Sequence, residues 1–272
     1  MENHALENLP KTLANSGAID IKKQLESTCG GKVLDVATEG GGFIQTLIEF
    51  LKDYDSFIGV DISQKKWDEK RFSKYPVKFL EMNAESLEFE DSTFDTVCIS
   101  HSLHHLSSIN KVITEMKRVL KPNGYFILQE MFCDGSQSDA QKSDIFQHHW
   151  GAEIDRLFGI FHHKTFTKQE IQQIVTKLNL REVIVIESTH YVKCLTCDDK
   201  FECDNPKNNS IINFAIKEVD EDLHRLQKGL DQGILVNNSY VKRLLLEGEK
   251  IKKRIKKYGS ASASHLFFRG RK

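Results

Sequence analysis

Five short apolar runs recur along the first half of the chain, and polar or helical stretches separate them. Such runs predict buried strands, here at 32–37, 56–61, 77–82, 94–100 and 124–130. Between the last two runs, apolar residues return at the 3.6-residue period of a helix lying on a sheet. They are Ile109, Val112, Ile113, Met116, Val119 and Leu120. Strands that alternate with helices predict an α/β fold: a doubly wound, mostly parallel sheet with helices on both faces.

Polar side chains stand at or near the ends of these predicted strands. They are Asp35, Asp61, Asn83, Ser100 and Glu130. In doubly wound sheets, ligands bind in the crevice at the carboxyl ends of the strands. We therefore expect these five side chains to converge on one ligand-binding crevice.

The turn after the first strand carries three consecutive glycines and two acids. Asp35 and Glu39 flank the turn, and the glycines at 40–42 lead into a predicted helix, as in a nucleotide-binding turn. Two carboxylates would repel a pyrophosphate, whereas they suit a ligand with an ammonium and a sulfonium group. S-adenosylmethionine is such a ligand. An ordinary strand-to-helix turn is the alternative.

The turn and four later segments resemble the class I S-adenosylmethionine-dependent methyltransferases, in their type 11, small-molecule branch. The first motif of that family has an acid followed by glycines at alternate positions. Here Ala37 and Glu39 take the first two glycine positions and Gly41 takes the third. The resemblance covers about residues 32–130, and the later matching segments are 56–61, 83–85, 94–106 and 116–129.

The resemblance implies a seven-stranded, Rossmann-like sheet and a cofactor site for S-adenosylmethionine, with S-adenosylhomocysteine as product. In such a site Asp61 accepts from both ribose hydroxyls and Asn83 faces the adenine amine. Alternatively, Asp61 caps a helix that starts near Ser63. The expected cofactor-binding residues are Asp35, Ala37, Glu39, Gly41, Asp61, Ile62, Asn83, Ala84, Ser100 and His105.

Residues 132–166 are rich in histidine and aromatic side chains. They follow the fifth strand, where the family usually places substrate contacts, and such side chains could line an apolar chamber for a methyl acceptor. The alternatives are a core helix with surface histidines, or a histidine metal site. A proton-bearing acceptor needs a base, for which the candidates are His105, His148, His149 and Glu130.

The predicted sixth strand at 181–188 and the last strand, near 264–269, are separated by an insertion of about seventy residues. Its second part shows apolar residues at alternating steps of three and four, which predicts a helical hairpin that closes on itself, caps the site or makes a dimer. We expect a methyltransferase core at 1–189, the insertion at 190–260 and the last strand within 261–272. The insertion also holds Cys194, Cys197 and Cys203, near His190. We expect plain loop thiols there, with structural zinc or a redox role as alternatives.

The formal net charge of −1 gives no overall attraction to nucleic acid or membranes. We interpret the basic run at 250–257 as a solvated helix face, and no apolar stretch is long enough for a membrane span. These features favour a cytoplasmic enzyme with reduced cysteines, either a monomer or a homodimer. The expected activity is methyl transfer to an O, N or C nucleophile of a small molecule. The alternatives are an RNA methyltransferase and a non-catalytic S-adenosylmethionine-binding protein.

Overall fold

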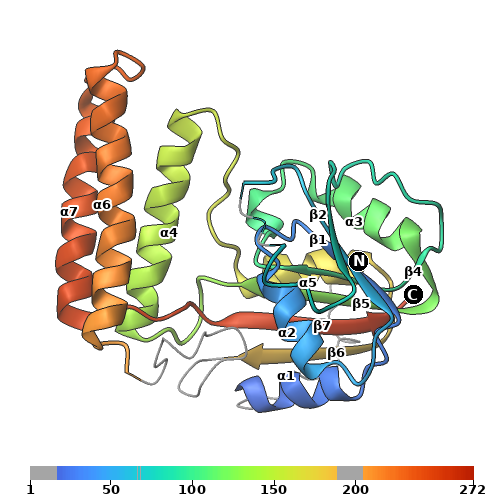
Figure 1. Cartoon of the computed structure of the whole chain (residues 1–272). Coiled ribbons are helices and arrows are strands. Elements are labelled where there is room, and N and C mark those ends of the chain that lie inside the picture. Colours follow the sequence, from blue (N-terminus) through green and yellow to red (C-terminus); the bar gives the residue numbers. More distant parts are fainter. Residues whose placement is uncertain (1–16, 66, 68, 189–204) are drawn as a thin grey trace, which may run out of the picture. The chain divides into compact units, whose positions relative to one another are not determined.

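The computed structural model describes residues 17–65, 67, 69–188 and 205–272 (Figure 1). The described residues fall into two compact units. We call residues 17–131, 168–188 and 265–272 the sheet unit, and residues 132–167 and 205–264 the helical unit. The cysteines at 194, 197 and 203, with His190, lie outside the described residues.

The sheet unit contains a seven-stranded sheet in the order β3-β2-β1-β4-β5-β7-β6. Only β7 runs antiparallel to its neighbours, β5 and β6. This confirms the expected mostly parallel, doubly wound sheet. The strands are β1 (Lys32–Val36), β2 (Ser56–Asp61), β3 (Val77–Glu81), β4 (Phe94–Ser100), β5 (Leu120–Met131), β6 (Arg181–Ser188) and β7 (His265–Arg271).

The central strands are apolar because they are covered on both faces. Val33, Leu34, Val97 and Ile99 are fully buried in β1 and β4. The predicted stripe of α3 faces inward, with Val112, Ile113, Met116 and Val119 buried. The flanking elements are α1 (Gly17–Glu26), α2 (Gly42–Phe50), η1 (Leu103–His105), α3 (Ile109–Val119) and α5 (Lys168–Lys177).

The strand order places a topological switch point between β1 and β4. Both strands pair in parallel, and the chain leaves β1 toward β2 on one side and reaches β4 on the other. Ligands of open α/β sheets bind at such a point, outside the carboxyl ends of the strands. The glycine turn after β1 and the segment after β4 therefore flank the expected crevice.

The helical unit consists of α4 (Asp139–Leu157), α6 (Asn209–Asp231) and α7 (Ser239–Tyr258), which lie side by side (Figure 1). The predicted hairpin is confirmed: α6 and α7 bury Val219, Leu226, Leu244 and Ile255 against each other and against α4. Trp150 of α4 joins this core, and its indole N–H donates to the Leu244 carbonyl at 2.9 Å.

The histidine-rich and aromatic segment therefore contributes α4 to the same core as the hairpin, whereas the sequence analysis assigned it to the methyltransferase core. Capping side chains start each helix of this unit. Ser138 and Gln141 form a reciprocal capping box at α4, and asparagines at 208 and 238 cap α6 and α7. Among the described residues, no helix is long and apolar enough to cross a membrane.

Candidate cofactor site

The turn between β1 and α2 alternates left-handed residues with ordinary ones. Ala37, Glu39 and Gly41 have φ values of 54°, 47° and 78°. These are the three positions at which the family motif has glycine. An L side chain in this conformation costs roughly 1–2 kcal/mol because its Cβ crowds the carbonyl. The backbone conformation therefore explains the glycine pattern of the family, and this chain keeps the conformation with two side chains in place.

Hydrogen bonds to the neighbouring strands hold the turn. The Thr38 amide donates to the Val60 carbonyl at 3.0 Å, and the Thr38 hydroxyl donates to an Asp35 oxygen at 2.6 Å. The Glu39 amide donates to Asp61 Oδ2 at 2.9 Å. The turn is thus fixed from both β1 and β2.

Asp35 is the buried acid of the site, with 1% of its surface exposed. Burial raises the pKa of Asp35 to about 7, although hydrogen bonds from Thr38 and Cys98 favour the ionised form, and the negative charge of Asp61 raises the pKa further. Asp35 is therefore poised to change its charge near neutral pH when a cation binds beside it.

Asp61 ends β2, as expected, and faces the turn. One of its carboxylate oxygens accepts from Glu39, and the other accepts from the Ser63 amide at 3.1 Å. No helix starts at Ser63 in the described part of this segment, so Asp61 caps a turn and not a helix. A carboxylate has about four lone-pair sites, which leaves acceptor capacity for ribose hydroxyls. Ile62, next in the chain, is 72% exposed.

Aromatic side chains line the turn on the β3 side. A Cβ added to Gly41 would lie 2.9 Å from the Phe72 ring and 3.0 Å from the Phe79 ring. Trp67 stacks on Phe79 with ring centres 5.6 Å apart. These rings require glycine at position 41 for space as well as for φ. Neither Phe72 nor Trp67 was expected from the sequence, since both lie outside the regular elements.

Asn83 and Ala84 follow β3, where the family places its adenine-binding turn. Asn83 Oδ1 accepts from the Glu85 amide at 2.9 Å, which closes a local turn, and Ala84 is buried. The Met82 amide donates to the Asp61 carbonyl at 2.8 Å. The ends of β2 and β3 therefore meet, as the convergence argument requires.

The end of β4 is tied to the glycine turn by Ser102, a residue that the sequence analysis missed. Its hydroxyl lies within hydrogen-bond distance of the Ser100 carbonyl, at 2.8 Å, and the Ala37 carbonyl, at 3.2 Å. His101, the neighbour of Ser102 in the chain, contacts Gln129 of β5, and their side-chain nitrogens are 2.9 Å apart. Because that amide nitrogen donates, the His101 ring accepts at Nε2, and burial lowers its pKa.

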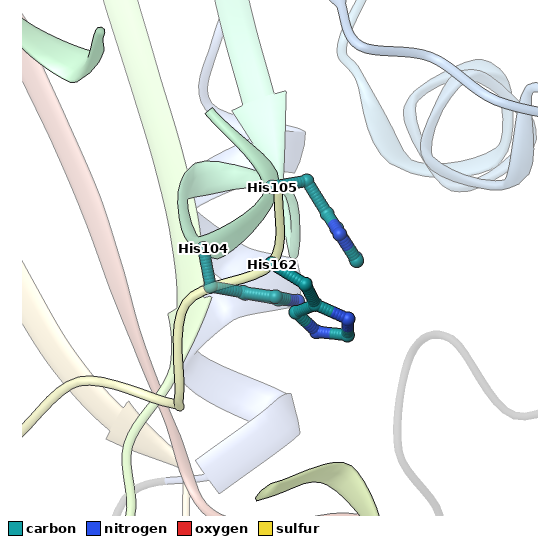
Figure 2. Close-up of side chains that lie close together, drawn as sticks. All are labelled: His104, His105 and His162. Atoms are coloured by element: carbon teal, nitrogen blue, oxygen red, sulfur yellow. The ribbon is translucent and has the colours of Figure 1, made fainter. Parts of the chain in front are cut away.

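The two neighbouring histidines of η1 differ in their environment. His104 is 2% exposed, and its Nδ1 lies 3.0 Å from Glu130 Oε1. His105 is exposed. Figure 2 shows both side chains leaving η1, and their ring centres are 4.3 Å apart. His105 was expected as a site residue from the sequence, and the structure adds His104 as its anchored neighbour.

Glu130 is completely buried and accepts three hydrogen bonds. The donors are His104, the Leu103 amide at 2.7 Å and the Met131 amide at 3.0 Å. Burial acts to raise its pKa, but these donors and the nearby histidines outweigh burial and lower it. A carboxylate that is held ionised by donors is a weak base, so these contacts favour a positioning role for Glu130 over proton acceptance.

The other two base candidates, His148 and His149, lie on α4 in the helical unit. The His149 ring is hydrogen-bonded to the Thr165 hydroxyl, and burial, aided by Lys164, lowers its pKa to about 4. His148 Nε2 lies 3.2 Å from His162 Nε2. His149 is therefore neutral at physiological pH and only weakly basic.

The sheet is of the doubly wound type, with the glycine turn at its switch point, and known proteins with sequences and folds similar to this chain were compared with it. A methyltransferase-domain family, type 11, matches residues 34–128. A demethylmenaquinone methyltransferase of Lysinibacillus sphaericus is 33% identical over 114 residues, which are 41% of this chain and 49% of that protein. YcgJ of Bacillus subtilis, an uncharacterized methyltransferase, is 32% identical over 118 residues, which are 41% of this chain and 45% of that protein.

The crystal structure of YcgJ superposes with a TM-score of 0.51 at 17% identity, covering 94% of this chain and 97% of that one. At that identity the superposition supports the fold alone. The matched sequence spans about half the length of the two curated relatives. Residues 34–128 are therefore similar to the methyltransferase-domain family.

Proposed function

We propose that this protein transfers a methyl group from S-adenosylmethionine to an O, N or C nucleophile of a small molecule. The observation that carries the proposal is the left-handed turn of Ala37, Glu39 and Gly41, bonded to Asp61 at the end of β2. It has the backbone form that the family builds with three glycines, and it stands at the switch point of the sheet.

The residues of the site suit this cofactor chemically. Asp35 and Asp61 supply two carboxylates beside the turn, which favour a ligand with an ammonium and a sulfonium over a pyrophosphate. A Cβ added to Gly42 would meet no atom within 4 Å, so the backbone there is open to a close approach. The two carboxylates and the open backbone at Gly42 thus both suit S-adenosylmethionine.

When bound, the cofactor supplies a methyl group on a positively charged sulfur. In the proposed site Asp61 accepts from the ribose diol, Asn83 and Ala84 face the adenine, and the exposed Ile62 packs on the base. Asp35 faces the ammonium. These residues orient the reacting groups, and good orientation lowers a barrier by about 7–11 kcal/mol in favourable cases.

For the base we propose His105, because it is exposed beside the buried pair of His104 and Glu130. Glu130 fixes His104 and the Leu103 amide, and thereby the whole of η1. His105 would take the proton from an oxygen or nitrogen acceptor, an effect worth on the order of 10²–10⁴-fold in rate.

The contacts of α7 argue for a small molecule over RNA. Lys252 pairs with Asp220 at 2.6 Å, and Arg254 pairs with Asp139 at 3.1 Å while its guanidinium lies over the Tyr258 ring. Part of the basic run is thus engaged within the protein. Since a demethylmenaquinone methyltransferase is among the relatives, apolar quinols are the first acceptors to test, followed by small amines and phenols.

Calorimetry with S-adenosylhomocysteine tests the cofactor assignment. Asp61→Asn keeps one acceptor oxygen for the turn but loses the charge, and charge-assisted bonds are worth about 1.5–3 kcal/mol each. We expect binding at least about tenfold weaker. Asp55→Asn, at the opposite end of β2 on the surface, is the matched control and should bind as the unmodified protein does. Tight NAD binding without S-adenosylhomocysteine binding would refute the assignment.

Methyl-labelled S-adenosylmethionine tests the activity. We expect label in a small-molecule fraction, and none in an RNA fraction. A rival RNA enzyme would bind RNA with a steep salt dependence, about 0.7 log unit per phosphate contact for each log unit of salt on single strands. Cofactor binding without any labelled product across the acceptor panel and RNA would favour the non-catalytic alternative.

A further inference from the structure

His148 and His162 of the helical unit meet through their Nε2 atoms. The two nitrogens are 3.2 Å apart, the ring centres are 5.0 Å apart, and the ring planes are nearly perpendicular at 82°. His148 lies on α4, and His162 lies on the segment that follows it. Because fourteen residues separate them, helical periodicity could not have paired them.

These distances match two imidazoles on one tetrahedral ion. Ligand bonds of about 2.0–2.1 Å at the tetrahedral angle separate the two nitrogens by about 3.3 Å and the ring centres by about 5.2 Å. A linear N–H···N bond of the same length would place the ring centres about 5.5 Å apart. The observed ring-centre distance is therefore closer to that of two imidazoles on one tetrahedral ion than to that of a linear hydrogen bond.

The carboxylate of Asp155 holds His162 through the other ring nitrogen, Nδ1. His162 Nδ1 donates to Asp155 Oδ2 at 2.7 Å, which leaves Nε2 unprotonated as a ligand atom. The carboxylate–histidine pair is the usual support of a metal-bound imidazole, since it fixes both tautomer and ring orientation.

Asp155 is itself held in its ionised form. Arg225 donates to Asp155 Oδ1 at 2.6 Å, and its guanidinium lies 4.4 Å from the centre of the Phe158 ring. Burial acts to raise the pKa of Asp155, but the bonds from His162 and Arg225 outweigh burial and lower it. The Arg225–Asp155–His162 chain thus orients one ligand atom, and His148 supplies a second at matching distance.

We propose that His148 and His162 bind a divalent transition-metal ion of the zinc class, with Asp155 as the supporting carboxylate. Imidazole nitrogen suits zinc, copper and nickel. Two protein ligands leave positions for water or for an oxygen or nitrogen ligand, so the site is of the open type. The proposal does not depend on the proposed methyl transfer.

Zinc titration calorimetry on the full chain tests the proposal. The protein carries Cys194→Ser, Cys197→Ser and Cys203→Ser, so that the thiolates of the insertion cannot contribute. We expect one saturable site, lost in His148→Ala and in His162→Ala. Asp155→Asn should weaken binding by about 10–100-fold. His224→Ala, an exposed histidine of α6, is the matched control and should leave binding unchanged.

A second measurement covers the case in which a variant fails to fold. In the protein with both histidines intact, nitrogen-15 spectra should show the Nε2 resonances of His148 and His162 moving on zinc addition, with circular dichroism unchanged. Absence of saturable binding would overturn the proposal. So would binding that persists undiminished in both folded histidine variants, or Nε2 resonances that do not respond.

Discussion

Asp35 should make cofactor binding depend on pH near neutrality. Its pKa is raised to about 7 in the unliganded protein, chiefly by burial. A cationic ligand group beside it favours the ionised form, so binding is coupled to loss of the Asp35 proton. We expect the affinity for S-adenosylhomocysteine to rise by up to about tenfold per pH unit below pH 7 and to level off above it.

The same shift predicts the pH dependence of stability. The folded pKa of about 7 lies above the ordinary value of 3.8, so the folded state holds the proton more tightly. The contribution of Asp35 is most favourable below pH 4 and is lost as pH rises toward 7. The shift is worth about 4 kcal/mol in total. In Asp35→Asn this contribution is absent, so its stability relative to the unmodified protein should increase over the same range.

Calorimetry between pH 5.5 and 8.5, together with urea unfolding from pH 4 to 8, measures both effects. Asp144→Asn is the matched control, because burial raises the pKa of Asp144 to about 6 within the helical unit. That variant should change the pH dependence of stability without changing that of cofactor binding. A flat affinity of the unmodified protein between pH 6 and 8, or an unchanged slope in Asp35→Asn, would refute the reasoning.

Five substitutions that remove or add a glycine test the packing. Gly41→Ala should lose at least about 1–2 kcal/mol of stability and weaken cofactor binding, since φ is 78° and the rings are close, whereas Gly42→Ala should be tolerated in urea unfolding and calorimetry. Glu39→Gly should gain up to about 1 kcal/mol, because relief of the left-handed conformation exceeds the entropy cost of glycine; a clear loss would contradict this. Gly248→Ala should lower the melting temperature, since its Cβ would lie 2.7 Å from the Trp150 ring, while Gly151→Ala, with only a 3.5 Å contact, should raise it.

The sheet could be predicted because a buried strand leaves a plain pattern of apolar residues. β2, β4 and β6 begin and end where their apolar runs do. β5 begins earlier, at Leu120, because the segment before Gly124 already lies along β4. Residues 121–124 are mostly polar and show no apolar run, so the sequence pattern could not indicate that β5 begins at Leu120.

The side chains near the carboxyl ends of the strands were only partly predictable. A sequence shows two adjacent histidines after β4, but not that η1 buries His104 against Glu130 while His105 faces solvent. Glu130 looked like a base because it is an acid near the end of a strand. Its role depends on donors that lie twenty-six and twenty-seven residues earlier in the chain, and sequence patterns do not report such contacts.

Asp61 holds the glycine turn in addition to its proposed contact with the ribose. The left-handed conformations of Ala37 and Glu39 cost about 2–4 kcal/mol together. Three bonds oppose that cost: Thr38 to the Val60 carbonyl, Thr38 to Asp35, and Glu39 to Asp61. A neutral hydrogen bond contributes about 0.5–1.5 kcal/mol and a charged one about 1.5–3 kcal/mol, so the three bonds together offset the cost of the left-handed conformations. The turn therefore holds its form before the cofactor arrives, and removal of the whole Asp61 side chain would loosen the turn as well as the ribose contact. For this reason Asp61→Asn, which keeps an acceptor for Glu39, separates the two effects where Asp61→Ala cannot.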